Sequence, residues 1–317
     1  MNRSQHSRQL LRIGRRVETR GEHGATAFRP VDGGPEHGPR PARGRSLCVV
    51  SGKGGTGKSS ILASLSEHFR QAGRTLLLDA DLGCANAHIF HDVHPERTLA
   101  DVVAGDRSMA EVVTPSAPHL DLLPGGSGVG RLAGLVDYEL EVIGRGLSRV
   151  EPDYDLTLVD AAAGVSRQTV AFAAACDRAL LVTTPDVTAM TDAYAFLKVF
   201  VGHCEAVGDP RPLPLLVVNR VASADEGAQV TGRLREVTRK FLGRDLEVLG
   251  ELPDDRAVFR CTQQRRSVLA GEPNSEVGRA LRSLAVELAA RLAESPGGGA
   301  GARLAAMHGQ PPASRRA

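Results

Sequence analysis

Lysine is scarce in this chain. The 317 residues contain 39 lysines and arginines together, and only four of these are lysine, so 39 − 4 = 35 are arginine. Two of the four, Lys53 and Lys58, lie within the stretch SGKGGTGKSS at residues 51–60, and the others are Lys198 and Lys240. Lysine carries a compact point charge on a slim stem, whereas arginine presents a planar fork. We therefore expect both positions in the glycine-rich stretch to require the slimmer cation.

Tryptophan is absent, and aromatic residues make up only 3 % of the chain, although 42 % of the residues are hydrophobic. The core must be built from leucine, valine and alanine, which suits an aliphatic parallel sheet covered by helices. No apolar run reaches the roughly 18 residues of a membrane-spanning helix. The N-terminus is polar and arginine-rich, so we expect no secretory signal.

Cysteine pairs are also missing. The five cysteines are widely spaced and form no Cys-x-x-Cys motif; they are Cys48, Cys84, Cys176, Cys204 and Cys261. An odd number at such spacing indicates reduced thiols in a cytoplasmic protein. The spacing also argues against a structural metal or an iron–sulfur cluster, which needs convergent thiolates.

The net charge of +2 is unevenly distributed. Residues 1–46 contain ten arginines and four acidic residues, and residues 295–317 contain three arginines and no acid, which gives +6 and +3. The middle of the chain therefore carries 2 − 6 − 3 = −7. We expect a basic, largely disordered extension over 1–46 with a short helix in SRQLLRIGRRVETR, one folded domain over 47–294, and a disordered tail over 295–317.

Short aliphatic runs alternate with segments of helical spacing between residues 47 and 294. The predicted strands are 47–51, 75–79, 120–124, 156–160, 179–184, 215–219 and 246–253. Runs that are apolar throughout and separated by helices are typical of a parallel sheet with both faces covered. We therefore predict an α/β fold with a single doubly wound, mostly parallel sheet.

The last predicted helix, EVGRALRSLAVELAARLAE, leaves one alternative open. Its apolar stripe consists of Val277, Leu281, Leu284, Leu288 and Leu292. This stripe suits a helix that closes the core, and it also suits an amphipathic helix at a membrane surface. Acidic residues on the polar face favour the core position.

The stretch between the first strand and the first helix has the spacing of a phosphate-binding loop. Gly52 is followed, after four residues, by Gly57, Lys58 and Ser59. In such a loop the glycines let backbone N–H groups turn inward around phosphates, and the helix N-terminus adds its dipole. Lys58 would reach the β- and γ-phosphates, and the Ser59 hydroxyl would bind Mg²⁺. The pattern does not require Lys53, which we interpret either as a solvated loop lysine or as a second cation directed at a phosphate.

Three aspartates follow predicted strands on the same side as this loop. Asp160 ends the strand LTLVD, where its carboxylate can orient a magnesium-bound water or cap the next helix. Asp79 and Asp81 lie two residues apart after TLLL, so an extended chain directs both carboxylates to one side. They can address the metal and the attacking water, or serve as turn residues.

The form KGGTGKS at Lys53–Ser59 resembles the deviant phosphate loop of the MinD/ParA family of dimerising ATPases. LLLDADLGCANAH resembles that family's first switch region, LTLVDAAAG its second, and LLVVNR and ELPDD its adenine-contacting segments. The resemblance implies ATP and Mg²⁺ as cofactors. It implies nucleotide contacts at Gly52, Gly54, Gly55, Thr56, Gly57, Lys58, Ser59, Ser60, Asn86, Asn219, Pro253 and Asp255, and metal contacts at Ser59, Asp79 and Asp160. The implied catalytic residues are Lys53, acting on the partner's nucleotide in a dimer, Lys58, and Asp81, which activates water.

Further stretches resemble the FlhG (FleN) subfamily, which controls flagellar number and placement. They are DADLGCANAHIF, LLPGGSGVGRLAGL and VTTPDVTAMTDAYAFLKV. The chain departs from this subfamily in two places, because SQHSRQLLR lacks the full N-terminal activating motif and GARLAAMHGQPPASRRA is poor in apolar residues for a membrane-targeting helix.

Together these features predict an ATP hydrolase that is slow until a partner stimulates it, and that acts as a flagellar switch. The expected partners are a second copy of the chain and an FlhF-like GTPase or flagellar switch protein, with a weak peripheral contact at the inner membrane face left open. The alternatives are septum positioning of MinD type and DNA partition of ParA type. The charge of −7 on the folded part argues against a broad nucleic-acid surface.

Overall fold

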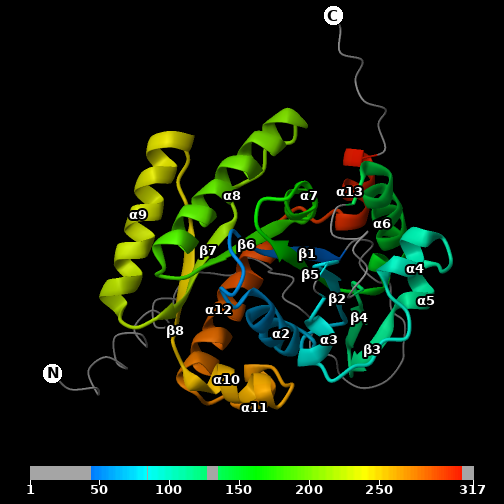
Figure 1. Cartoon of the computed structure of the whole chain (residues 1–317), viewed down its shortest axis with the longest axis horizontal. Helices are drawn as coiled ribbons and strands as arrows, with labels where there is room; N and C mark the ends of the chain where they lie inside the picture. The colour runs from blue at the N-terminus through cyan, green and yellow to red at the C-terminus, as the bar shows by residue number, and fades with distance from the viewer. Residues whose placement is uncertain (1–43, 84, 127–134, 309–317) are drawn as a thin grey trace, which may run out of the picture.

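The computed structural model describes residues 44–83, 85–126 and 135–308, and it has an eight-stranded sheet with helices on both faces (Figure 1). The strands are β1 (Arg45–Ser51), β2 (Thr75–Ala80), β3 (Thr114–Ala117), β4 (Leu120–Leu123), β5 (Leu156–Ala163), β6 (Arg178–Thr183), β7 (Leu215–Val221) and β8 (Val248–Pro253). Their order in the sheet is β3-β4-β2-β5-β1-β6-β7-β8. The short helix expected near the N-terminus lies outside the described residues.

The helices that pack around this sheet follow the strands along the chain. They are α2 (Lys58–Phe69), α3 (Ala87–Phe90), α4 (Leu99–Ala104), α5 (Met109–Val112), α6 (Asp137–Val150), α7 (Arg167–Ala175), α8 (Val187–Ala206), α9 (Ala224–Leu242), α10 (Arg256–Gln263), α11 (Val268–Gly271), α12 (Glu276–Ala293) and α13 (Ala300–His308), with the one-turn η3 (Glu151–Asp153) after α6. The two longest described helices, α8 and α9, lie beside each other at one end of the molecule (Figure 1).

All neighbouring strands pair in parallel except β3, which runs antiparallel to β4 at the edge of the sheet. The seven strands predicted from aliphatic runs are present, and the predicted α/β fold class is confirmed. The sequence did not indicate β3, because its residues TPSA are polar and include Pro115. Proline cannot donate to a ladder, so a strand that contains it is restricted to a sheet edge, where β3 lies.

The sheet separates two hydrophobic cores. Along β1, Cys48 and Val50 face the core covered by α4–α9 and α13, whereas Leu47 and Val49 face the core covered by α2 and α10–α12. The apolar stripe of α12 is fully buried in the second core, which places this helix in the core and not at a membrane surface. Among the described residues, no helix combines the length and apolarity needed to cross a bilayer.

The expected disordered tail over 295–317 is wrong for residues 300–308, which form α13. This helix packs on α6 and α7, and Leu304 is fully buried. Its close approach to α6 depends on small residues, because a Cβ atom added at Gly301 would lie 2.3 Å from the backbone nitrogen of Ser148. Local composition rich in glycine and alanine suggested disorder, and the complementary glycine on α6, Gly144, lies too far away in sequence to be recognised.

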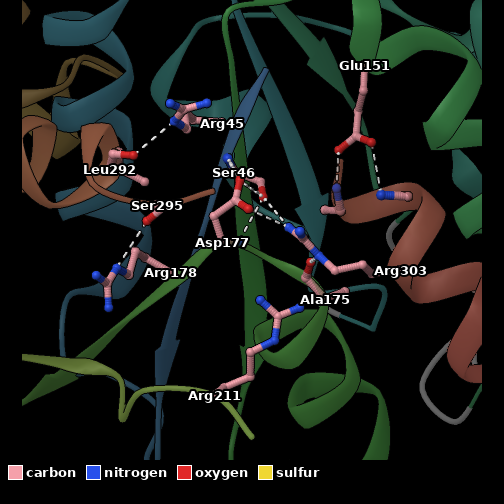
Figure 2. Close-up of polar contacts among 12 residues, drawn as sticks. Arg45, Ser46, Glu151, Ala175, Asp177, Arg178, Arg211, Leu292, Ser295 and Arg303 are labelled. Atoms are coloured by element: carbon pink, nitrogen blue, oxygen red, sulfur yellow. Dashed lines mark hydrogen bonds and ion pairs between the residues drawn. The ribbon is translucent and has the colours of Figure 1, made fainter. Parts of the chain in front are cut away.

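Polar contacts fasten α13 to the starts of two central strands (Figure 2). Arg303 donates from Nη2 to Oδ1 of Asp177 over 2.8 Å, and its Nε donates to the carbonyl oxygen of Ala175. The other carboxylate oxygen of Asp177 accepts from the backbone nitrogen of Ser46 over 2.8 Å and from its hydroxyl over 2.9 Å. Because Ser46 belongs to β1 and Asp177 precedes β6, α13 is joined to the centre of the sheet.

The first turn of α13 is capped by a buried carboxylate. Both oxygens of Glu151 accept backbone N–H groups over 2.9 Å, one from Ala300 and one from Gly301. Burial raises the pKa of Glu151 to about 7, although these hydrogen bonds act in the opposite direction. A carboxyl group whose pKa rises on folding disfavours the folded state once it ionises there.

We therefore expect wild-type protein to lose stability relative to Glu151→Gln as the pH rises from the ordinary glutamate pKa, 4.5, to about 7. The contribution of Glu151 is fully present below pH 4.5 and is lost as the carboxyl ionises in the folded state. Thermal unfolding followed by circular dichroism between pH 5 and 8 measures this difference. Parallel curves for the two proteins across that range would contradict it.

Candidate functional site

The phosphate-loop segment connects the carboxyl end of β1 to the N-terminus of α2. Gly57 has φ +92°, in the left-handed region, and a Cβ atom there would lie 2.3 Å from Nδ2 of Asn219. At Gly52 a Cβ atom would lie 2.2 Å from the backbone of Asp192 in α8. Glycine is thus required at both ends of the loop, at one by backbone conformation and at both by close contact. The contact at Gly52 also presses the loop directly against α8.

One side of the loop is open and rich in hydrogen-bond donors. A Cβ atom at Gly54 or Gly55 would meet nothing within 4 Å. The first turn of α2 has no side-chain cap, so its N–H groups are left for a ligand. The hydroxyl of Thr56 is buried and has no hydrogen-bond partner among the described residues. Open space, free amides and an orphaned hydroxyl fit the phosphate groups of a nucleotide.

Lys58 and Asp160 form a buried ion pair at the base of this loop. The distance from Nζ to Oδ1 is 2.6 Å, and the side chains are 7 % and 2 % exposed. Lys58 Nζ also lies 3.4 Å from the hydroxyl of Ser59. The lysine, the serine hydroxyl and the carboxylate that the sequence predicted as phosphate and metal contacts are therefore together.

Asp79 lies beside Asp160 in the register of β2 and β5. Its Oδ1 accepts from the backbone nitrogen of Asp81 over 3.2 Å, and its Oδ2 accepts from that of Ala87 over 2.9 Å. Burial, and then the charge of Asp160, raise the pKa of Asp79 to about 8. The geometry shows Asp79 organising the turn after β2, which leaves Asp81 half-buried and Asn86 exposed on that turn.

The oxygen atoms near Ser59 suit a magnesium ion. Within the described parts of the chain, no group of three or more histidine, cysteine, aspartate or glutamate side chains is placed to hold a metal. Mg²⁺ commonly takes few protein oxygens and completes its shell with water and substrate phosphates. The Ser59 hydroxyl and the Asp160 carboxylate would supply the protein ligands here, whereas both oxygens of Asp79, the third predicted metal contact, accept the backbone N–H groups of Asp81 and Ala87.

Lys53 points away from its own phosphate loop. Its Nζ lies 3.1 Å from Oδ2 of Asp186 and donates to the hydroxyl of Thr188, and its side chain is 41 % exposed. Asp186 caps the N-terminus of α8. Hydrogen bonds from Thr188, followed by that from Lys53, lower the pKa of Asp186 to about 2. The two loop lysines therefore occupy different environments, one buried in the site and one at its exposed rim.

The predicted base-contacting residues lie at the ends of β7 and β8. Asn219 is buried and donates from Nδ2 to the carbonyl oxygen of Thr56 over 2.7 Å, so it supports the loop directly. Pro253 ends β8. Asp255 accepts backbone N–H groups from Ala257 over 2.9 Å and from Val277 over 3.3 Å, which joins α10 to α12.

Sequence reasoning missed contacts that no motif spacing marks. The N-terminal turn of α8, with Asp186 and Thr188, receives Lys53 from a segment 133 residues earlier. Arg220 adopts φ +59° where the pairing of β7 with β8 shifts register, and its Nε lies 3.7 Å from Oδ1 of Asp254. A non-glycine residue in the left-handed region is uncommon and carries a conformational cost. Only the position of Arg220 directly after Asn219 hinted at it.

Solved structures share this fold. MinD of Pyrococcus furiosus superposes with a TM-score of 0.64 and 24 % identity, covering 77 % of this chain and 98 % of that one. MinD of Pyrococcus horikoshii, solved with Mg-ADP, gives a TM-score of 0.63 and 25 % identity over 77 % of this chain and 95 % of that one. The similarity confirms the fold.

Sequence comparison gives the same result. The antiactivator FleN of Pseudomonas aeruginosa is 31 % identical over 240 residues, which cover 75 % of this chain and 84 % of FleN. The flagellum site-determining protein YlxH of Helicobacter pylori is 29 % identical over 251 residues, covering 78 % and 82 %. Residues 47–268 match the CobQ/CobB/MinD/ParA nucleotide binding domain. As the resemblance predicted, the chain belongs to the CobQ/CobB/MinD/ParA family of nucleotide-binding domains.

Proposed function

We propose that this chain is a magnesium-dependent ATPase that dimerises when it binds ATP and separates after hydrolysis. The observation that carries this proposal is the separation of the two loop lysines. Lys58 is buried beside Asp160, where it serves its own nucleotide, whereas Lys53 lies exposed on the N-terminus of α8. A cation at the rim of a nucleotide site is placed to reach across an interface, as arginine fingers do in other phosphoryl-transfer enzymes.

Each of the remaining site residues has a role in the proposed ATP binding and hydrolysis. Lys58 and the loop N–H groups neutralise phosphate charge, and Ser59 and Asp160 hold Mg²⁺, which stabilises charge on the transferred phosphoryl group. Asp81 orients the attacking water from the turn that Asp79 organises. Asn219 and the segment from Pro253 to Asp255 hold the base end of the nucleotide.

The biological process we propose is control of flagellar number or placement. The support is the similarity to FleN and YlxH, whose names refer to antiactivation and to flagellum site determination. Septum-positioning MinD proteins are also similar, at 26 % identity for that of Bacillus subtilis. Affinity capture with Asp81→Ala, which we expect to trap the ATP dimer, separates the two. Recovery of FlhF-type or flagellar switch proteins supports the proposal, whereas recovery of division-septum proteins or of a chromosome-bound adaptor contradicts it.

Lys53→Ala is expected to abolish ATP-dependent dimerisation while changing the affinity for ATP by less than about threefold. In the described part of the chain, the Lys53 side chain contacts Asp186 and Thr188 at the exposed rim and no group of the phosphate site, and exposed ion pairs contribute about 0–1 kcal/mol to stability. The partner-stimulated hydrolysis rate should fall by about 10³–10⁵ if Lys53 acts as a finger in trans. Light scattering with Mg²⁺ and ATP measures dimerisation, and titration with a fluorescent ATP analogue measures the affinity for ATP.

The matched control is Lys198→Ala, which removes an exposed lysine from α8 without touching the phosphate loop. It should dimerise as the wild type does. The proposal fails if wild-type protein remains monomeric with Mg²⁺ and ATP, or if Lys53→Ala forms the same dimer.

A further inference from the structure

An aromatic ring stands exposed on α9, outside the nucleotide site. The side chain of Phe241 is 63 % exposed, although it belongs to a chain with few aromatic residues. Two side chains contact the ring. Tyr194 of α8 meets it edge-on with 6.4 Å between ring centroids, and Nζ of Lys240 lies 5.3 Å from its centroid. Exposed aromatic side chains of this kind often serve as anchors in protein interfaces.

A surface hollow lies along the same helix. It has a volume of about 440 Å³ and is lined by Gly232, Arg235, Glu236, Arg239 and Lys240. A Cβ atom at Gly232 would meet nothing within 4 Å, so the glycine leaves this stretch of the helix uncovered. We call this hollow, together with Arg233 and Phe241, the α9 patch. The patch thus combines one apolar anchor with a shallow, open strip of the same helix, and Lys240 connects the two because it lines the strip and contacts the ring.

The charge of the α9 patch is opposite to that of the folded domain. The patch carries four cations, Arg233, Arg235, Arg239 and Lys240, and one acid, Glu236, which gives +3. Arg239 is partly neutralised by Asp245 at 2.7 Å. In the described part of the chain, Arg233 and Lys240 form no ion pair, and Arg235 donates to a backbone carbonyl oxygen. These uncompensated cations lie on a folded unit, residues 45–308, whose net charge is −7 + 2 = −5 once Arg45 and Arg303 are included, so they create a local field for an anionic ligand.

We propose that the α9 patch binds an acidic protein segment that carries an apolar or aromatic side chain. The acidic residues would pair with Arg233 and Lys240, while the apolar side chain would pack on Phe241 beside the hollow. A nucleic acid fits less well, because Glu236 lies among the cations and would face the phosphate backbone. An anionic bilayer fits less well, because one ring offers little apolar area for insertion.

The position of the α9 patch connects it to the phosphate loop. Tyr194, which touches Phe241, lies two residues after Asp192, whose backbone abuts Gly52. The same helix, α8, holds Lys53 at its N-terminus through Asp186. A segment bound on the α9 patch is therefore one helix away from the lysine that we assign to dimerisation. This consequence rests on the proposed function, whereas the docking itself does not.

The test uses the full chain and a fluorescein-labelled 16-residue peptide of aspartate and glutamate with a central Leu-Phe pair. Fluorescence anisotropy measures its affinity for wild type, Phe241→Ala and Lys240→Glu. We expect each substitution to weaken binding by about tenfold or more, since truncation of an anchor typically costs over 1 kcal/mol. A peptide with Gly-Ser in place of Leu-Phe should bind the wild type more weakly.

Matched controls exist on other faces of the molecule. Phe259 on α10 is 66 % exposed, so Phe259→Ala removes an equally accessible ring, and Arg149→Glu reverses an exposed charge on α6. Both should bind the peptide within about twofold of the wild type. The proposal is overturned if the peptide does not bind, if the controls weaken it as much as the patch variants, or if a 16-base-pair DNA duplex or phosphatidylglycerol vesicles bind the patch in preference. Phe241→Ala should hydrolyse ATP at the wild-type rate, because Phe241 lies outside the nucleotide site. The ATPase assay thus tests the proposed function independently of peptide binding.

Discussion

Lys58→Ala is expected to abolish ATP binding and to destabilise the nucleotide-free protein. Without Lys58, Asp160 is left buried beside Asp79 with no cation. Removing one member of a buried ion pair typically costs about 3–5 kcal/mol, because the remaining charge is uncompensated. Uptake of a proton by the aspartate pair sets an upper limit on this loss. Urea denaturation without nucleotide and titration with a fluorescent ATP analogue measure the two effects separately.

The double variant Lys58→Ala/Asp160→Asn distinguishes the stabilising role of the pair from its role in nucleotide binding. Asparagine removes the unpaired charge at nearly the same volume, so the double variant should regain most of the lost stability. It should not regain ATP binding, since the phosphate-binding cation and a magnesium ligand are both missing. Additive losses in the double variant, or a Lys58→Ala protein as stable as the wild type, would show that the pair contributes little.

Most of the sheet was predictable from sequence because its central strands are buried on both faces. The first four residues of β7, LLVV, are all aliphatic because both faces of the strand are buried, and that constraint is visible in the sequence. The edge strand β3 is paired on one side only, so it lacks this requirement and carries Pro115. Helix α13 was not predicted, for a different reason. Its stability depends on glycine-to-backbone packing and on ion pairs with distant residues, none of which leaves a local periodicity.

The same distinction between local patterns and distant contacts applies to the nucleotide site. The phosphate loop is a local motif, in which strand, glycines, lysine and helix follow one another, so its residues were predicted individually. The environment of Lys53 depends instead on the start of α8, which the fold brings beside the loop. Asp255, predicted as a nucleotide contact, also has a structural role that its motif does not indicate, because both of its oxygens accept backbone amides and thereby join two helices. A motif therefore predicts the position of a residue, whereas the contacts in the folded chain determine its structural role.

Arg303→Ala is expected to destabilise the protein by about 3–5 kcal/mol, far more than a typical surface arginine. The side chain of Asp177 is 0 % exposed, and Arg303 is its cationic partner at 2.8 Å. The two hydrogen bonds from Ser46 remain in the variant, but they carry no charge to balance the carboxylate. Loss of the contact also releases α13 from the starts of β1 and β6, which exposes Leu304 to solvent.

Arg291→Ala is the matched control for this prediction. Arg291 also pairs with a carboxylate, Glu247 at 2.6 Å, but both side chains are partly exposed, so the expected cost is about 0–1 kcal/mol. Denaturant unfolding of both variants measures the difference, and Arg303→Ala/Asp177→Asn should recover part of the loss by removing the buried charge. Equal stabilities for Arg303→Ala and Arg291→Ala would mean that α13 rests on the domain without being anchored to it. A large difference would establish that the residues after α12 belong to the folded unit, because only a helix docked in the native state can transmit the loss of Arg303 to global unfolding.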